Sequence, residues 1–137
     1  MITVGAYEAK TRLSELLALV LPDEGESPDR WVGILASAAI DVPDVWHYEV
    51  ANALIVGVRR ERLTSAEAGL AASLLGSLGA KTHPAPPLAR LLAVGAAHGL
   101  SAYDAAYLVL ATDTGSSLLT RDAGLTRAAQ ASGVPLG

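Results

Sequence analysis

Short apolar segments alternate along this chain with longer segments of helical periodicity, and no other feature constrains its fold as strongly. Short runs typical of strands are expected at residues 2–7, 39–42, 81–83 and 116–120, with a last extended stretch at 134–136. Strands separated by helices pair in parallel, and a parallel sheet has to be covered on both faces. The sequence therefore predicts an α/β fold whose ligand sites lie at the carboxyl ends of the strands.

The segments between these strands carry signals for where helices start and stop. Thr64 followed by Glu67 has the pattern of a capping box, Ser101 is a candidate N-cap, and Gly99 is a candidate C-cap. The helices expected from these signals and from apolar spacing are 8–21, a stretch from 27 through 35, 45–60, 64–76, 88–98, 102–112 and 122–131.

Length and composition indicate one compact domain. The 137 residues are 51% hydrophobic and 18% charged, and there is no cysteine, which excludes disulfide and thiolate chemistry. Charged residues interrupt the first helical segment, so neither a signal peptide nor a membrane span is expected. We therefore expect a cytoplasmic location. The net charge of -4 gives no overall attraction to nucleic acid. Arg59, Arg60 and Arg62 are therefore either local phosphate contacts or a solvated helix end.

Three acidic residues occur where an α/β fold places chemistry. Glu49 lies early in a helix of small and apolar residues, and Asn52 follows on nearly the same face, where its amide can position a carboxylate or a water. Asp104 lies in the first turn of an apolar helix, where an unpaired carboxylate is costly. Asp122 directly follows an expected buried strand, with Thr120 as a supporting residue.

Each of these acids also has an ordinary structural interpretation. Glu49 can be a first-turn acid that the helix dipole stabilises, Asp104 can serve in capping, and Asp122 is a natural N-cap. The functional interpretation rests on their convergence, because three acids meeting at one edge of one sheet would form a negative pocket that requires a hard cation.

Three segments resemble a known family. The sequences PDVWHYEVANAL, HGLSAYDAAYLVLA and LLTRDAGL are similar to the corresponding segments of VapC-type toxins of the PIN-domain family, over roughly residues 21–137. The resemblance implies a three-layer α/β fold with a central, mostly parallel sheet, and RNA cleavage that depends on Mg²⁺ or Mn²⁺. It also implies a homodimer and a cognate antitoxin, and it makes Glu49, Asp104 and Asp122 the metal-binding acids.

The N-terminal segment departs from that family. A gap-free alignment places Arg12 where the family's first acid lies and Ser14 where its serine lies. Instead, ITVGAYEAKTRLSELL at residues 2–17 resembles the start of Phd/YefM-type antitoxins, and the resemblance covers about residues 1–20. If the first strand ends at Tyr7, Glu8 takes the position of the missing acid, with the helix about one turn longer. Glu8 is then either a fourth carboxylate ligand or a solvated first-turn acid.

The expected function is that of a toxin from a type II toxin-antitoxin system, a metal-dependent endoribonuclease. Two other interpretations stay open: a catalytically impaired PIN-like binding module that keeps its dimer and antitoxin surfaces, and a DNA-binding, antitoxin-like regulator. The histidines lack metal-ligand spacing and are expected to be structural: His47, His83 and His98. Four aromatic residues in apolar helical segments are expected to lie in the core rather than to stack on bases: Tyr103, Tyr107, Trp31 and Trp46.

Overall fold

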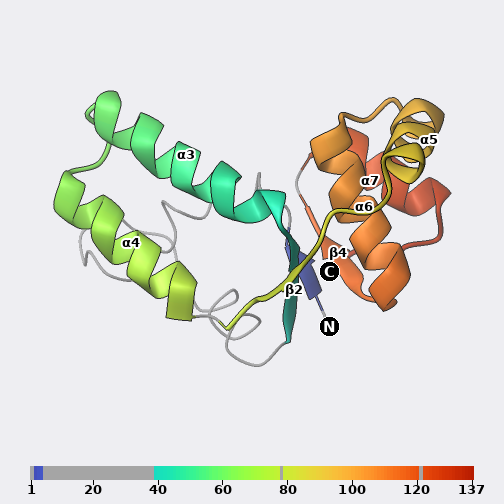
Figure 1. The fold of residues 1–137 in the computed structure, drawn as a ribbon, viewed down its shortest axis with the longest axis horizontal. Coiled ribbons are helices and arrows are strands. Elements are labelled where there is room, and N and C mark those ends of the chain that lie inside the picture. Colours follow the sequence, from blue (N-terminus) through green and yellow to red (C-terminus); the bar gives the residue numbers. More distant parts are fainter. Residues whose placement is uncertain (1, 5–38, 78, 121) are drawn as a thin grey trace.

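Four parallel strands and five helices make up the part of the chain that the computed structural model describes, residues 2–4, 39–77, 79–120 and 122–137 (Figure 1). The strands are β1 Ile2–Val4, β2 Ile40–Pro43, β3 Lys81–His83 and β4 Ser117–Leu119. The helices are α3 Val45–Arg59, α4 Ser65–Ser77, α5 Leu88–His98, α6 Ala102–Thr114 and α7 Ala123–Ala131.

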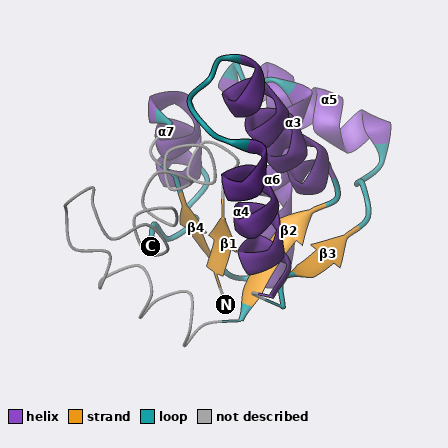
Figure 2. Ribbon diagram, turned by 90° about the vertical axis from the view of Figure 1, so that its left-hand side faces the viewer, coloured by secondary structure: helices purple, strands orange, loops and turns teal. Residues whose placement is uncertain are grey.

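The strands form one sheet in the order β3-β2-β1-β4, which Figure 2 shows face on. Every pairing is parallel, and Thr3 of β1 is aligned with Asp41 of β2 on one side and with Leu118 of β4 on the other. Consecutive parallel strands require a crossover connection, and helices supply the described crossovers from β2 to β3 and from β3 to β4. The structure is a mixed α/β fold with a small parallel sheet flanked by helices.

The helices are arranged on two sides of the sheet, which Figure 1 shows nearly edge on. Helices α3 and α4 pack against each other on one side. Helix α6 packs against β1, β2 and β4 on the other side, with α5 and α7 packed on α6. The core lies between these layers, and Val42, Tyr107 and Leu118 are among its most buried side chains.

The element boundaries follow the local signals closely. Helix α4 begins with the expected capping box, since the Glu67 N–H donates to Thr64 Oγ1 and the Thr64 N–H donates to Glu67 Oε2, both at 3.1 Å. Gly99 and Gly115 adopt left-handed conformations after α5 and α6, with φ of 64° and 62°. Because Gly115 supplies this cap, α6 ends at Thr114, slightly beyond the predicted end.

Some of the remaining expectations are corrected by the structure, and others concern residues outside the described ranges. The strand expected at 116–120 is shorter, Ser117–Leu119, and the extended stretch at 134–136 contributes one bridge, between Leu136 and Leu118. The expected helices at 8–21 and 27–35 lie outside the described residues, as does the end of the first strand beyond Val4. No helix in the described ranges has both the length and the apolar character needed to cross a membrane.

Candidate functional site

The carboxyl edge of the sheet contains a topological switch point. From β1 the strand order runs through β2 to β3 in one direction, whereas β4 lies on the opposite side of β1. Open parallel sheets bind ligands where the strand order reverses in this way, because the connections leave in opposite directions and open a crevice. Here the reversal falls between β1 and β4, and the segments that follow β2 and β4 each carry one of the predicted acids.

Glu49 lies in the second turn of α3, the helix that directly follows β2. Its helix begins at Asp44, whose carboxylate accepts a hydrogen bond from the Val45 N–H at 2.8 Å. The half-buried Glu49 carboxylate extends to α6, where the Tyr107 hydroxyl donates to Oε1 at 3.4 Å. This contact joins two helices from opposite sides of the sheet and holds the carboxylate of α3 against α6.

Asp104 lies in the first turn of α6, one turn before Tyr107. The Ser101 side chain accepts a hydrogen bond from the Asp104 N–H at 3.1 Å, so the predicted N-cap is present and fixes the backbone at the acid. The Asp104 side chain is half-buried and lies at the positive end of the helix dipole.

Asp122 lies directly before α7 and serves as its N-cap, as one of the two interpretations predicted. Its Oδ1 accepts a hydrogen bond from the Leu125 N–H at 2.7 Å, and its own N–H donates to Thr120 Oγ1 at 3.1 Å. A Cβ built on Gly124 would lie 3.2 Å from Asp122 Oδ1 and 3.9 Å from Leu100 Cδ2. The start of α7 therefore adjoins the residue that precedes the cap of α6.

The structure places Glu49 against the helix that carries Asp104, and it does not group all three acids. Glu49 reaches α6 through Tyr107, and Asp122 lies beside the segment that leads into α6. Within the described ranges no three Asp, Glu or His side chains are placed to share one metal ion. Asn52 is exposed on α3, and the fourth predicted acid, Glu8, lies outside the described residues together with Arg12 and Ser14.

Asp41 is a residue that the sequence reasoning missed. It lies in β2, is 2% exposed, and is the one charged residue classed as buried in the described part of the chain. Its Oδ1 lies 2.6 Å from His83 Nε2 of the neighbouring strand β3, whereas Oδ2 has no hydrogen-bond partner among the described residues. An acid inside an apolar strand segment was the available signal, because a buried carboxylate requires a partner.

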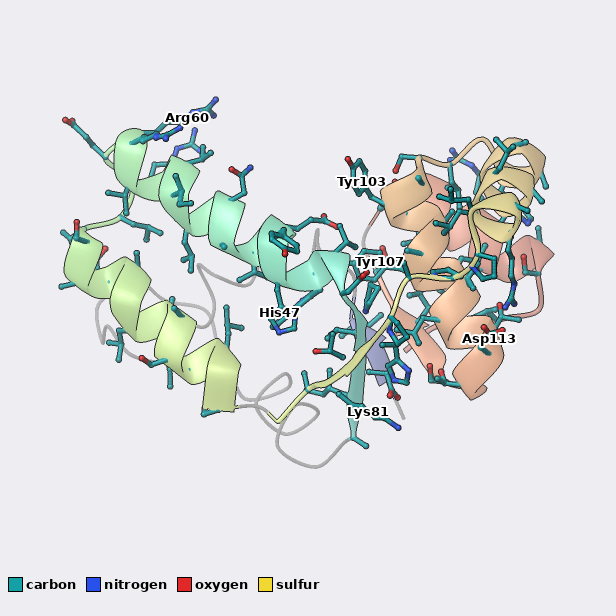
Figure 3. The ribbon with its side chains drawn as sticks, viewed as in Figure 1. His47, Arg60, Lys81, Tyr103, Tyr107 and Asp113 are labelled. Atoms are coloured by element: carbon teal, nitrogen blue, oxygen red, sulfur yellow. The ribbon has the colours of Figure 1, made fainter. Side chains whose placement is uncertain are left out.

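The aromatic residues correct one expectation. Tyr107 and Trp46 are buried at 1% and 6% exposure, which confirms their predicted place in the core. The prediction for Tyr103 is wrong: its side chain is 63% exposed and projects from the start of α6 towards the side where α3 lies (Figure 3). The first turn of α6 lies at an exposed end of the helix, so an apolar sequence context does not bury it. Trp31 lies outside the described residues.

Each of the three histidines contacts another side chain. His47 packs edge to face on Trp46 with ring centroids 5.1 Å apart, and His98 Nε2 lies 3.2 Å from Ser132 Oγ. His83 makes the contact with Asp41.

Comparison with known proteins gives a structural similarity and no family assignment. No protein-family model and no curated protein matches the sequence. Among solved structures, the chain is similar to PAE2754 from Pyrobaculum aerophilum, with a TM-score of 0.70 and 25% sequence identity. The similarity covers 93% of this chain and 78% of that one.

Proposed function

We propose that this protein is a metal-dependent endoribonuclease with a three-layer, PIN-like fold, acting as the toxin of a type II toxin-antitoxin system. The observation that carries the proposal is the Tyr107 hydrogen bond to Glu49, which links the acid of α3 to α6, the helix that carries Asp104 one turn before Tyr107. The position of Asp122, beside the segment leading into α6, adds a third carboxylate from the switch-point side of the sheet.

The chemistry of these side chains suits a hard divalent cation. Carboxylate oxygens are the ligands that Mg²⁺ and Mn²⁺ take, and Glu49, Asp104 and Asp122 would supply them, with Glu8 as the further candidate. When bound, such a cation lowers the pKa of a coordinated water and offsets charge on the phosphoryl oxygens of RNA. The described residues contribute the positioning, through the Tyr107 hydroxyl on Glu49, the Ser101 cap at Asp104 and the Thr120 hydroxyl at Asp122.

A catalytically impaired binding module is the second candidate. One observation favours it: Asp122 uses Oδ1 to cap α7, which competes with binding of a cation by the same oxygen. In that case the fold and its partner surfaces persist while metal affinity is weak. The two candidates differ in whether Mn²⁺ stabilises the folded protein, since a ligand that binds only the folded state raises its melting temperature.

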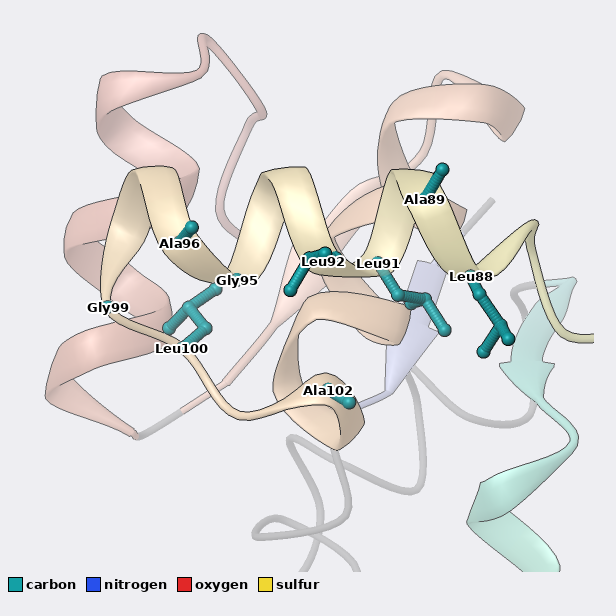
Figure 4. A pocket seen from close by; sticks show the side chains of 9 residues that line it. All are labelled: Leu88, Ala89, Leu91, Leu92, Gly95, Ala96, Gly99, Leu100 and Ala102. Atoms are coloured by element: carbon teal, nitrogen blue, oxygen red, sulfur yellow. The ribbon is translucent and has the colours of Figure 1, made fainter.

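We further propose that the protein is a cytoplasmic homodimer that a cognate antitoxin neutralises. Support for a dimer comes from an apolar groove of about 590 Å³ that α5 forms with the segment leading into α6 (Figure 4). Leu88 and Leu92 on this face are 85% and 75% exposed, and small residues such as Gly95 and Ala96 line the groove between α5 and the start of α6. A second copy would remove these side chains from water, which favours association.

The direct test is Mn²⁺-dependent cleavage of a labelled RNA by Asp104→Asn. Removing a metal-binding carboxylate is expected to lower the cleavage rate by at least about 100-fold, the upper end of what changes to supporting residues cause. Asp113→Asn is the matched control, because it makes the same change on the same helix at an exposed position away from the site. Cleavage by the control should equal that of the unchanged protein. Cleavage that persists without metal in Asp104→Asn would falsify the proposal.

Metal titration followed by thermal unfolding separates the two candidates and tests Glu8. The ribonuclease predicts a melting temperature that rises with Mn²⁺ and a rise that Asp104→Asn removes. If Glu8 is a ligand, Glu8→Gln weakens the effect as Asp104→Asn does. If Mn²⁺ raises the melting temperature of Glu8→Gln as much as that of the unchanged protein, but does not raise that of Asp104→Asn, Glu8 is excluded from the site. If Mn²⁺ raises the melting temperature of neither the unchanged protein nor its variants, the protein is the impaired module.

A further inference from the structure

The buried contact between Asp41 and His83 joins two neighbouring strands near the carboxyl edge of the sheet. Asp41 is 2% exposed, and its Oδ1 lies 2.6 Å from His83 Nε2. The strand register aligns Asp41 with Lys81 rather than with His83, so the side-chain contact is diagonal and reaches the last residue of β3. The contact therefore ties β2 to the carboxyl end of β3.

A buried polar pair of this kind is a poor source of stability. Burial removes the hydration of a carboxylate, and a well-packed apolar pair of similar size is often as stable or more stable. Asp41 carries a further cost, because its Oδ2 has no hydrogen-bond partner among the described residues. A polar pair supplies a directional contact at a fixed distance, which an apolar pair does not. Its role should therefore be sought in the geometry that the contact fixes.

His83 is bonded a second time, through its backbone, to the residue where α3 begins. The Asp44 N–H donates to the His83 carbonyl oxygen at 3.0 Å. Asp44 is also the N-cap of α3, and its carboxylate accepts from the Val45 N–H at 2.8 Å. Within the described sheet β3 is an edge strand, so β2 is its single strand neighbour. The start of α3 is thus attached to a strand end that the Asp41 contact holds in place.

The start of α3 determines where Glu49 lies. Helix α3 leaves directly from the carboxyl end of β2, as Figure 1 shows. Glu49 lies about 7.5 Å beyond Asp44 along the helix axis. Its Oε1 accepts from the Tyr107 hydroxyl at 3.4 Å, which is long for an O–H donor. A small shift at the start of α3 would therefore break the contact between α3 and α6.

We propose that Asp41 and His83 are positioning residues for the candidate site. Their contact sets the end of β3, the end of β3 sets the start of α3, and the start of α3 holds Glu49 against Tyr107. In this role the pair acts through α3 and not by touching a ligand. The proposal rests on the proposed ribonuclease function and deepens it, because a reacting group displaced by about 1 Å loses much of its effect.

The experiment compares thermal stability with Mn²⁺-dependent cleavage of a labelled RNA. His83→Leu alone should lower the melting temperature, because it leaves a buried carboxylate without its partner. Asp41→Leu combined with His83→Leu removes both polar groups and should restore the melting temperature. The Mn²⁺ concentration for half-maximal cleavage should still rise about 10- to 100-fold in this double variant, as when groups that orient metal ligands are replaced.

Two further variants separate positioning from packing. His83→Gln keeps a donor near the place of Nε2 and should stay within about threefold of the unchanged protein in its Mn²⁺ requirement. Asp113→Asn is the control, because it changes an exposed contact between α5 and α6 and should leave the Mn²⁺ requirement unchanged. A double variant that regains both its melting temperature and the original Mn²⁺ requirement overturns the proposal.

A second readout does not depend on activity. The ¹³Cζ resonance of labelled Tyr107 reports the hydrogen bond to Glu49, and Glu49→Ala shows how the resonance moves when that bond is lost. The double variant should move it in the same direction. Asp41→Asn keeps the buried shape and weakens the contact, so it should cause a smaller shift and carries the test if the double variant does not fold. An unchanged Tyr107 resonance in the folded variants overturns the proposal.

Failure of the ribonuclease function has a different signature. A protein that never cleaves RNA, but whose Tyr107 resonance responds to the Asp41 and His83 variants, keeps the positioning pair and removes the enzyme. Cleavage that depends on Asp104 and is the same in the double variant removes the positioning role and keeps the enzyme.

Discussion

Helices α5 and α6 pack against each other, yet they bury their apolar residues very differently. Helix α6 is buried without a break from Ala105 to Ala111. Helix α5, which is similarly rich in Leu and Ala, has no buried residue, and its Leu92 is 75% exposed. Apolar composition is nearly equal in the two helices, so composition alone does not decide which of them becomes core.

The difference comes from what each helix contacts. Helix α6 lies between the sheet and the helices α5 and α7, and a helix surrounded in this way is apolar on all sides. Among the described elements, helix α5 has its main contact with α6, and its outer face is exposed. Asp104, Tyr103 and Tyr107 all belong to α6, the more buried of the two helices, so the core packing that positions α6 also positions the acid and the exposed ring beside it.

The largest expected effect tests this contrast directly. Leu108→Ala in α6 removes a side chain that is 2% exposed and part of the core, and it should lower the free energy of unfolding by about 2–5 kcal/mol. Leu92→Ala in α5 makes the same chemical change at an exposed position and should cost less than about 0.5 kcal/mol in dilute protein. Urea unfolding followed by circular dichroism measures both. Similar losses for the two variants contradict the contrast.

Measuring the same two variants at several protein concentrations tests whether a second copy covers α5. If a second copy covers α5, the stability of the unchanged protein rises with concentration, because association favours the folded state. The cost of Leu92→Ala should then grow with concentration, whereas the cost of Leu108→Ala remains dominated by the core. A cost of Leu92→Ala that stays constant from micromolar to millimolar protein argues against a dimer through this face.

Much of the fold was predictable because its boundaries depend on local signals. The range of α5 was predicted correctly from apolar spacing and from Gly99, and β3 was predicted correctly before a proline cluster. The capping box at Thr64 needed no tertiary information either. Each of these features depends on residues within about one helical turn, where backbone sterics and capping hydrogen bonds decide the outcome.

The candidate site was less predictable because its contacts join distant parts of the chain. The sequence singled out Glu49 and Asp104. It did not predict that Tyr107 would hold Glu49 against α6. The partner of Asp41, His83, lies on a neighbouring strand, so its pairing depends on the sheet order and register. Tyr103 was misplaced because helical spacing gives the face of a residue and not whether the end of the helix is covered.

A smaller effect is expected at the start of the two helices. Ser101 caps α6 with its side chain, whereas Pro87 at the start of α5 makes no side-chain cap bond. Ser101→Ala should lower the free energy of unfolding by about 1 kcal/mol, because it leaves the Asp104 N–H without its acceptor. Hydrogen exchange should show faster exchange of the Asp104 amide. Ser101→Asp restores an acceptor and should recover most of the loss, and a failure to recover it would show that the side chain acts by packing.

The smallest effect is expected for the ion pair that joins the two helices. Arg90 of α5 donates two hydrogen bonds to the Asp113 carboxylate of α6, one of them from Nη1 at 2.6 Å, and both side chains are at least 40% exposed. These hydrogen bonds raise the pKa of Arg90, so its contribution is present throughout the neutral range and is lost only as pH rises through that high pKa. A double-mutant cycle with Arg90→Met and Asp113→Asn should give a coupling of about 0.2–1 kcal/mol that shrinks with added salt. A coupling that is larger than this and insensitive to salt would mean that the contact between α5 and α6 is shielded from water, and that α5 is less peripheral than its exposed leucines indicate.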